Sequence, residues 1–171
     1  MNIDNLNTEL RSRAIDLGLC NDWQNNIWNC NLSNDELINI YKKGIDFCIE
    51  HEYPSLDIIK TRFERSFLNE RNIYVDDEIK AENSSGTIVI NGKSRGELYY
   101  DEFTSADIYV RHESEIKINA KGISKIFVNV YDCANIKVIQ GEMAKVYLYV
   151  HGNTCNIDAK GEILIRHSDI S

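Results

Sequence analysis

Three stretches in the second half of the chain repeat one pattern: IYVRHESEIKINAKG (108–122), VNVYDCANIKVIQG (128–141) and LYVHGNTCNIDAKG (148–161). Their apolar residues recur at intervals of twenty positions. Two apolar series run through the repeats: Ile88, Ile108, Val128 and Leu148, and Ile90, Val110, Val130 and Val150. A fixed period of this kind indicates stacked structural units, each of which buries its apolar side against its neighbours.

Each repeat has the composition of short strands. Apolar residues alternate with polar ones or form β-branched runs, which is typical of β-structure. Twenty residues hold two or three short strands with tight corners, so each repeat is predicted to be one coil of a parallel β-helix. Inward residues of successive coils then stand about 4.8 Å apart. An antiparallel meander is the alternative and needs hairpin dipeptides; Asn91-Gly92 fits, whereas its counterparts Arg111-His112 and Tyr131-Asp132 do not.

Further series complete the predicted interior. They are Phe103, Ile123, Met143 and Ile163; Leu98, Ile118 and Val138; and Ala106, Ile126 and Val146. The second series fails at Asp158, where Ile157 is expected to take the place, and the third ends at Arg166. One position of the frame is always small, as Ser94, Ser114, Ala134 and Thr154. Glycines suit the corners, because they turn without steric cost; they stand at positions 86, 92, 96, 122, 141, 152 and 161.

The first half has the spacing of helices. Residues 8–19 form one candidate helix, which Gly18 ends. Ser33 and Glu36 form a capping box that opens a second helix, with Leu37, Tyr41, Ile45 and Cys48 on its apolar face. Ser55 caps a third helix, whose buried stripe is Leu56, Ile59, Phe63 and Phe67.

The predicted fold class is therefore α+β. A small helical N-terminal capping domain spans residues 1–82, and a right-handed parallel β-helix of about four 20-residue coils spans residues 83–171. The right hand is chosen because most β-helices without a six-residue repeat have it. The helical half, leading in through residues 73–75, is expected to cap the first coil.

Charge and composition exclude several classes of function. The 171 residues carry a net charge of −8. Two helices joined by a short turn allow a helix-turn-helix, with Lys60, Arg62, Arg65 and Arg71 on or just beyond the second helix. Residues 1–85 hold sixteen acids against nine Lys and Arg, however, which argues against nucleic-acid binding. No apolar run approaches the roughly 18 residues that a membrane helix needs. The start of the chain lacks the features of a secretory signal, so no membrane association and a cytoplasmic location are expected.

Catalytic and metal-binding motifs are missing from the sequence. The five cysteines, Cys20, Cys30, Cys48, Cys133 and Cys155, are odd in number and lack C-x-x-C spacing. They are expected to be buried, reduced thiols rather than disulfides or zinc ligands. One corner brings His112 and Glu113 near Asp132 and Cys133, where a Cys133 nucleophile with His112 as base is the enzymatic alternative. An ordinary polar corner is favoured, so the chain is predicted to be no enzyme and to bind no metal or cofactor.

The outward positions of the repeats carry aromatic residues. If residues 88 and 90 point inward, their neighbours point outward and stack in columns. One face then carries Tyr109, Arg111, Phe127, Tyr131, Tyr147, Tyr149 and His151. Such side chains are enriched in the cores of protein interfaces. The face is expected to be covered by a protein partner, by a second copy of the chain or by the helical domain; a small ligand or glycan is a further alternative.

The three quoted stretches resemble the β-helix superfamily, and they are similar to repeats in short, uncharacterised proteins of phages and mobile elements. The resemblance covers residues 86–168. The aromatic face and the missing motifs predict a non-catalytic, cytoplasmic protein–protein interaction module. The resemblance suggests one concrete version, in which the module binds or inhibits a host defence protein, in the host cytoplasm if phage-encoded. Self-assembly into a structural scaffold is the first alternative, because the ends of a β-helix are open. A small enzyme or a glycan-binding or ligand-binding protein is the second.

Overall fold

The structure is a computed structural model that describes residues 3–29 and 32–168. The chain forms two compact units, Met1–Phe63 and Glu64–Ser171. The first unit is helical, and the second is a β-solenoid with one short helix before its first strand. The predicted α+β class, a helical region followed by stacked parallel coils, is confirmed. The right-handed sense of the coil stays a prediction.

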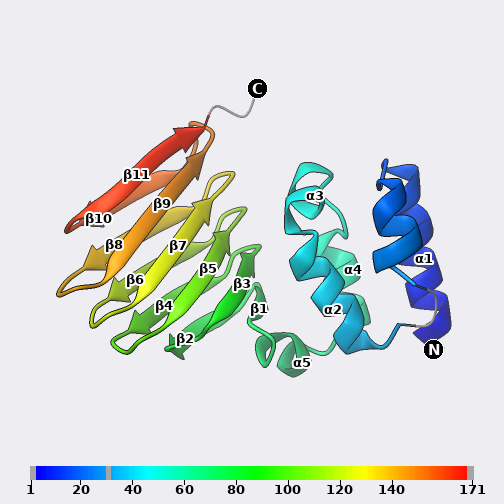
Figure 1. The fold of residues 1–171 in the computed structure, drawn as a ribbon, viewed down its shortest axis with the longest axis horizontal. Coiled ribbons are helices and arrows are strands. Elements are labelled where there is room, and N and C mark those ends of the chain that lie inside the picture. The colour runs from blue at the N-terminus through cyan, green and yellow to red at the C-terminus, as the bar shows by residue number, and fades with distance from the viewer. Residues whose placement is uncertain (1–2, 30–31, 169–171) are drawn as a thin grey trace. The chain divides into compact units, whose positions relative to one another are not determined.

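The solenoid consists of two sheets in which every pairing is parallel (Figure 1). The six-stranded sheet contains β1 (Ile73–Val75), β3 (Gly86–Asn91), β5 (Ser105–Val110), β7 (Lys125–Val130), β9 (Lys145–His151) and β11 (Ile163–Ser168). The five-stranded sheet contains β2 (Glu78–Glu82), β4 (Arg95–Tyr100), β6 (Glu115–Ala120), β8 (Asn135–Gln140) and β10 (Asn156–Lys160). The chain passes from one sheet to the other after every strand, so one strand of each sheet makes a coil.

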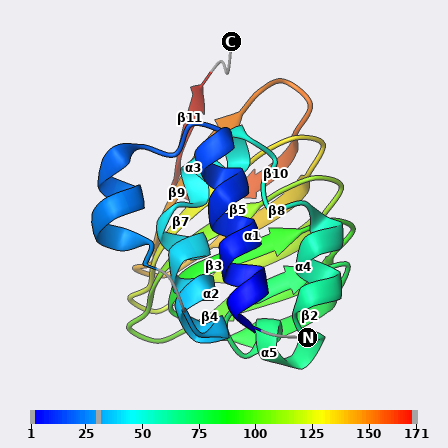
Figure 2. The same cartoon turned by 90° about the vertical axis from the view of Figure 1, so that its right-hand side faces the viewer.

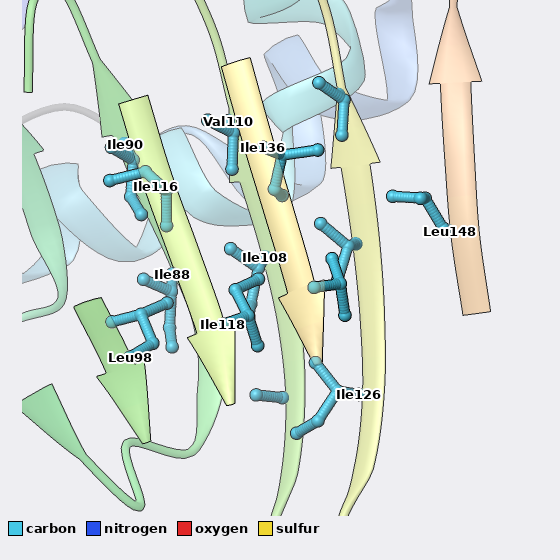
Figure 3. Packing of buried hydrophobic residues seen from close by; sticks show 14 of the residues in the cluster. Ile88, Ile90, Leu98, Ile108, Val110, Ile116, Ile118, Ile126, Ile136 and Leu148 are labelled. Atoms are coloured by element: carbon cyan, nitrogen blue, oxygen red, sulfur yellow. The ribbon is translucent and has the colours of Figure 1, made fainter. Parts of the chain in front are cut away.

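The core lies between the two sheets (Figure 3). Both series that define the repeat are buried as predicted, and so are the Leu98 and Ala106 series as far as Val138 and Val146. Ile116 and Ile136 add a buried pair from β6 and β8. The twenty-residue period follows from this arrangement, because two six-residue strands and two four-residue corners make one coil.

The second residue of several corners has a left-handed backbone. His112 and Asp132 occupy this position at one edge of the solenoid, with φ of 61° and 59°, and Gly92, their equivalent in the preceding coil, has a φ of 73°. The Gly92 N–H donates to His112 Nδ1 at 3.2 Å, and the His112 N–H donates to Asp132 Oδ2 at 2.9 Å. These bonds between coils compensate for the strain of a left-handed non-glycine residue. Two of the predicted corner glycines, Gly86 and Gly96, lie in strands instead.

The predicted inward series that begins at Phe103 is wrong. Phe103, Ile123 and Met143 are 88%, 56% and 69% exposed, because each is the third residue of a four-residue corner and points away from the core. A twenty-residue period is shared by every position of a coil, whether it faces the core or solvent. Periodicity alone therefore could not separate this series from the true ladders.

The solenoid begins earlier than residue 83 and has about five coils rather than four. Ile73 pairs with Val89, sixteen residues later, and Glu78 pairs with Arg95, seventeen later. The first coil is thus shorter than the others and falls outside the twenty-residue frame. Residues 73–82 consequently belong to the solenoid, and not to the helical domain of residues 1–82.

The last coil also departs from the twenty-residue frame: the spacing from β8 to β10 is longer than twenty residues, and the spacing from β9 to β11 is shorter. Ile157 pairs with Ile136, and Ala159 takes the place of Val138, so the expected substitution of Asp158 by Ile157 is wrong. Ile163 pairs with Val146 and continues the series that ended at Arg166 in the sequence. One extra residue before β10 and four fewer between β10 and β11, a net loss of three, account for both shifts.

The helical unit contains α1 (Ile3–Asp16), the π-helix η1 (Trp23–Ile27), α2 (Asn34–Lys43), α3 (Ile45–Glu50) and α4 (Leu56–Arg62); α5 (Arg65–Asn69) belongs to the second unit. Figure 2 shows α1 running alongside α2, and Leu10, Ala14 and Leu37 share one buried cluster. The capping box at Ser33 and the Ser55 cap are confirmed. Two predicted helices are each divided in the structure. One break lies at Gly44, and the other at Phe63, whose backbone is extended.

The basic residues near α4 and α5 have acidic or backbone partners. Arg62 contacts Glu9 at 2.9 Å in the helical unit. Arg65 contacts Asp77 at 2.8 Å, and the guanidinium of Arg71 lies 3.6 Å from the centre of the Phe67 ring. These contacts give the cations structural roles within their own units. No described helix is long and apolar enough to cross a membrane.

Candidate interaction surface

The register of the six-stranded sheet aligns the outward residues in columns, as predicted. Asp107, Phe127, Tyr147 and Leu164 are successive partners in one column. Val89, Tyr109, Asn129, Tyr149 and Arg166 form the next. The predicted aromatic residues therefore come together on one face, although they originate twenty residues apart in sequence.

Two ring pairs stack on this face, one within the first column and one at its edge. The Phe127 and Tyr147 rings lie 4.9 Å apart with 16° between their planes. The Tyr131 and His151 rings lie 4.1 Å apart and are nearly parallel, at 2°. Parallel in-register strands bring equivalent side chains within about 5 Å, which holds aromatic rings in contact. The face is consequently ordered by the same register that orders the core.

Part of the predicted face is not exposed. Arg111 and Tyr131 are only 4% and 8% exposed, whereas Tyr109, Phe127, Tyr147, Tyr149 and His151 are half-buried. Alternation along a strand gives the direction of a side chain but not its exposure, so the sequence could not separate these groups. We take as the accessible part of the face the side that carries Phe127 and Tyr147, because the strand residues two positions before them, Lys125 and Lys145, are exposed.

Sequence reasoning missed the residues that border this accessible part. Lys125 and Lys145 are exposed and paired in register, and Lys125 Nζ lies 4.9 Å from the Phe127 ring centre and 5.8 Å from that of Tyr147. We call Lys125, Phe127, Lys145 and Tyr147 the lysine–aromatic patch. A cation over an aromatic face is attracted by the ring quadrupole, so Lys125 and the two rings form one unit.

The exposed corner residues Phe103, Ile123 and Met143, here the apolar ridge, adjoin this patch. Strand register places the three corners in successive coils. A groove of about 480 Å³ joins ridge and patch, because Met143, Lys145, Tyr147 and Leu164 all line it. The sequence signal was the recurrence of a large apolar residue in the links DEFT, KGIS and GEMA, each of which also carries charge or glycine.

The opposite face, on the five-stranded sheet, has a different character. Its outward side chains form ion pairs between coils: Arg95 with Glu115 at 3.3 Å, Lys117 with Glu97 at 3.3 Å, and Lys137 with Asp158 at 2.7 Å. A hydrogen bond from Tyr99, assisted by Lys117, lowers the pKa of Glu97. Charges that satisfy one another on an exposed surface are typical of a solvated face.

The cysteines differ from the prediction. Cys48 is buried, but Cys20 and Cys133 are exposed and Cys155 is half-buried; Cys30 lies outside the described residues. Cys133 occupies the third position of a corner, like the ridge residues at the other edge, and therefore faces away from the core. Desolvation, followed by the nearby Asp132, raises the pKa of the Cys155 thiol and so disfavours its reactive thiolate.

Comparison with protein-family models, with curated proteins and with solved structures finds no match to this chain. A function for the chain is therefore inferred from the chemistry of its surface.

Proposed function

We propose that the chain is a non-catalytic recognition module, which binds a protein partner through the lysine–aromatic patch and the apolar ridge. The observation that supports this proposal is the exposure of the ridge. Phe103 and Met143 are 88% and 69% exposed, and Met143 lines one groove with Tyr147, whose ring stacks on Phe127. Large apolar side chains grouped on one surface mark interaction sites, because their burial against a partner removes them from water.

The chemistry of the patch restricts the partner. A complementary surface offers an apolar strip to the ridge and acidic groups to Lys125 and Lys145. The aromatic rings are held by stacking, so they lose little conformational freedom on binding. A shallow groove between coils suits an extended or helical segment of a protein better than a small molecule, which is usually enclosed on most sides.

One specific form of the proposal comes from the resemblance to phage and mobile-element proteins. In this form the chain acts in the cytoplasm of a host cell and blocks a host defence protein by occupying its surface. That step rests on analogy, whereas the recognition surface rests on geometry.

Site-specific cross-linking tests the proposal. A photoreactive phenylalanine derivative is placed at Tyr147 in the patch and, as the matched control, at Tyr99 on the five-stranded sheet. We expect cross-links to one defined protein from position 147 and none from position 99. The same products from both positions, or binding of a glycan in place of a protein, would contradict the proposal.

A further inference from the structure

The C-terminal end of the solenoid presents two open strand edges. Among the described residues, β11 and β10 each pair with a neighbouring strand on one side only. Ile165 pairs in register with the fully buried Leu148, yet it is 40% exposed, and Leu164 is 47% exposed. The apolar ladder therefore emerges at this end, together with unpaired backbone groups. Native proteins cover or pair such edges, because they invite another strand.

At the other end of the solenoid, the first strand of the six-stranded sheet is covered. Helix α5 packs against β1, where Ile73 and Val75 are buried. The Arg65 Nε contacts Asp77 at 2.8 Å and the Arg65 guanidinium donates to the Asp76 carbonyl at 3.1 Å, which fastens α5 to the first coil. Because α5 covers β1, β11 of a second solenoid cannot pair head to tail with that strand. Association at the open end is thus limited to a closed, symmetric pair.

We propose that β11 pairs in an antiparallel manner with β11 of a second copy, about a twofold axis at Leu164. In this register Ile163 lies opposite Ile165 of the other copy, and Glu162 lies opposite Arg166. Directly opposite residues share a face, so Ile163 and Ile165 extend the apolar interior while Glu162 and Arg166 form two ion pairs on the outer surface. The rotation that relates the β11 edges also brings the two β10 edges together.

The charge pattern favours this occupant. Glu162 and Arg166 lie at equal distances on either side of Leu164. A twofold axis at Leu164 therefore places each acid opposite the base of the other copy, which gives two ion pairs. A register shifted by two residues toward the end of the chain would place Leu164 opposite Arg166 and leave the charges unmatched. The open edge is thus self-complementary in both its apolar and its charged positions.

Charge reversal combined with sedimentation velocity tests the dimer. The full-length chain is measured over a series of concentrations as wild type, Glu162→Arg, Arg166→Glu and the double reversal, with Lys125→Glu in β7 as the control. We expect the wild type to be a dimer and each single variant to have a dimer dissociation constant at least tenfold higher. The double variant should regain the wild-type dissociation constant. The control should remain dimeric.

A wild type that stays monomeric at every concentration would overturn the proposal. So would a double reversal as dissociated as the single variants while circular dichroism shows that all remain folded. The outcome is independent of the proposed function, because Tyr147→Ala removes a patch ring but leaves Glu162 and Arg166 in place. That variant should remain dimeric whether or not the patch binds a partner.

Discussion

Gly96 and Gly152 show how single residues determine whether the coils can stack. Both have positive φ, at 144° and 88°. A methyl group at position 96 would overlap the backbone carbonyl of Ile79 in the neighbouring strand, whereas a methyl at position 152 would meet open space. Close approach of two strands, rather than a turn, is therefore the reason for glycine at position 96.

A pair of alanine variants separates these two effects. Gly152→Ala carries only the cost of a left-handed alanine, about 1 kcal/mol. Gly96→Ala must also displace the Ile79 backbone and should lose clearly more of the free energy of unfolding. Urea denaturation followed by the β-sheet signal in circular dichroism measures both. Equal losses would show that β2 and β4 are not in the described contact.

Tyr53 makes the helical unit sensitive to high pH. Its hydroxyl donates to the Leu10 carbonyl at 3.0 Å, and burial, followed by the charge of Glu9, raises its pKa from 10 to about 12. The folded state holds the phenolic proton more tightly than the unfolded chain does. The resulting stability is therefore complete below pH 10 and is lost as the pH rises to about 12.

The prediction for Tyr53 is a loss of up to about 3 kcal/mol in the stability of the helical unit between pH 10 and pH 12. Urea denaturation at several pH values, followed by the helix signal, measures it. Tyr53→Phe is the control: it should be less stable at neutral pH by about 1 kcal/mol, because the Leu10 carbonyl loses its donor. If the free energy of unfolding fell between pH 10 and pH 12 by the same amount in wild type and in Tyr53→Phe, the Tyr53 hydroxyl would not be the cause.

At the scale of elements, what could be predicted depended on the repeat. The Ile88 and Ile90 ladders were predictable, because four strands repeat them without a shift. The first coil was not, since its pairings are only sixteen and seventeen residues apart. The aromatic columns followed from the same frame as the core, but the exposure of Phe103 and the burial of Arg111 did not. Direction follows from alternation, whereas exposure depends on packing that no periodicity encodes.

The short first coil and α5 are expected to protect the solenoid from aggregation. A fragment that begins at Glu64 keeps α5, β1 and β2, whereas one that begins at Ser84 loses them and uncovers Ile88 and Ile90. The longer fragment should remain soluble with a β-sheet spectrum, and the shorter one should aggregate. Light scattering distinguishes the two. A soluble shorter fragment with an unchanged melting temperature would show that the first coil is dispensable.

At the scale of the whole molecule, each surface of the solenoid has its own character. The five-stranded face carries ion pairs between its coils, β1 of the first coil is covered by α5, and among the described residues the last coil is open. The apolar ridge and the lysine–aromatic patch remain as the surface whose chemistry lacks an internal explanation. Pairing through β11 would place two such patches on one particle and raise the apparent affinity for a multivalent partner.

The recognition of a protein by this surface is the central claim, and the affinity of patch variants tests it most directly. The partner identified by cross-linking is purified, and isothermal titration calorimetry measures its affinity for wild type, Phe127→Ala, Tyr147→Ala and the control Tyr99→Ala. If both rings are interface anchors, each patch variant should bind roughly 30-fold more weakly, which corresponds to about 2 kcal/mol. The control should bind like wild type, and all variants should melt at similar temperatures. Patch variants that bind as tightly as wild type would contradict the account.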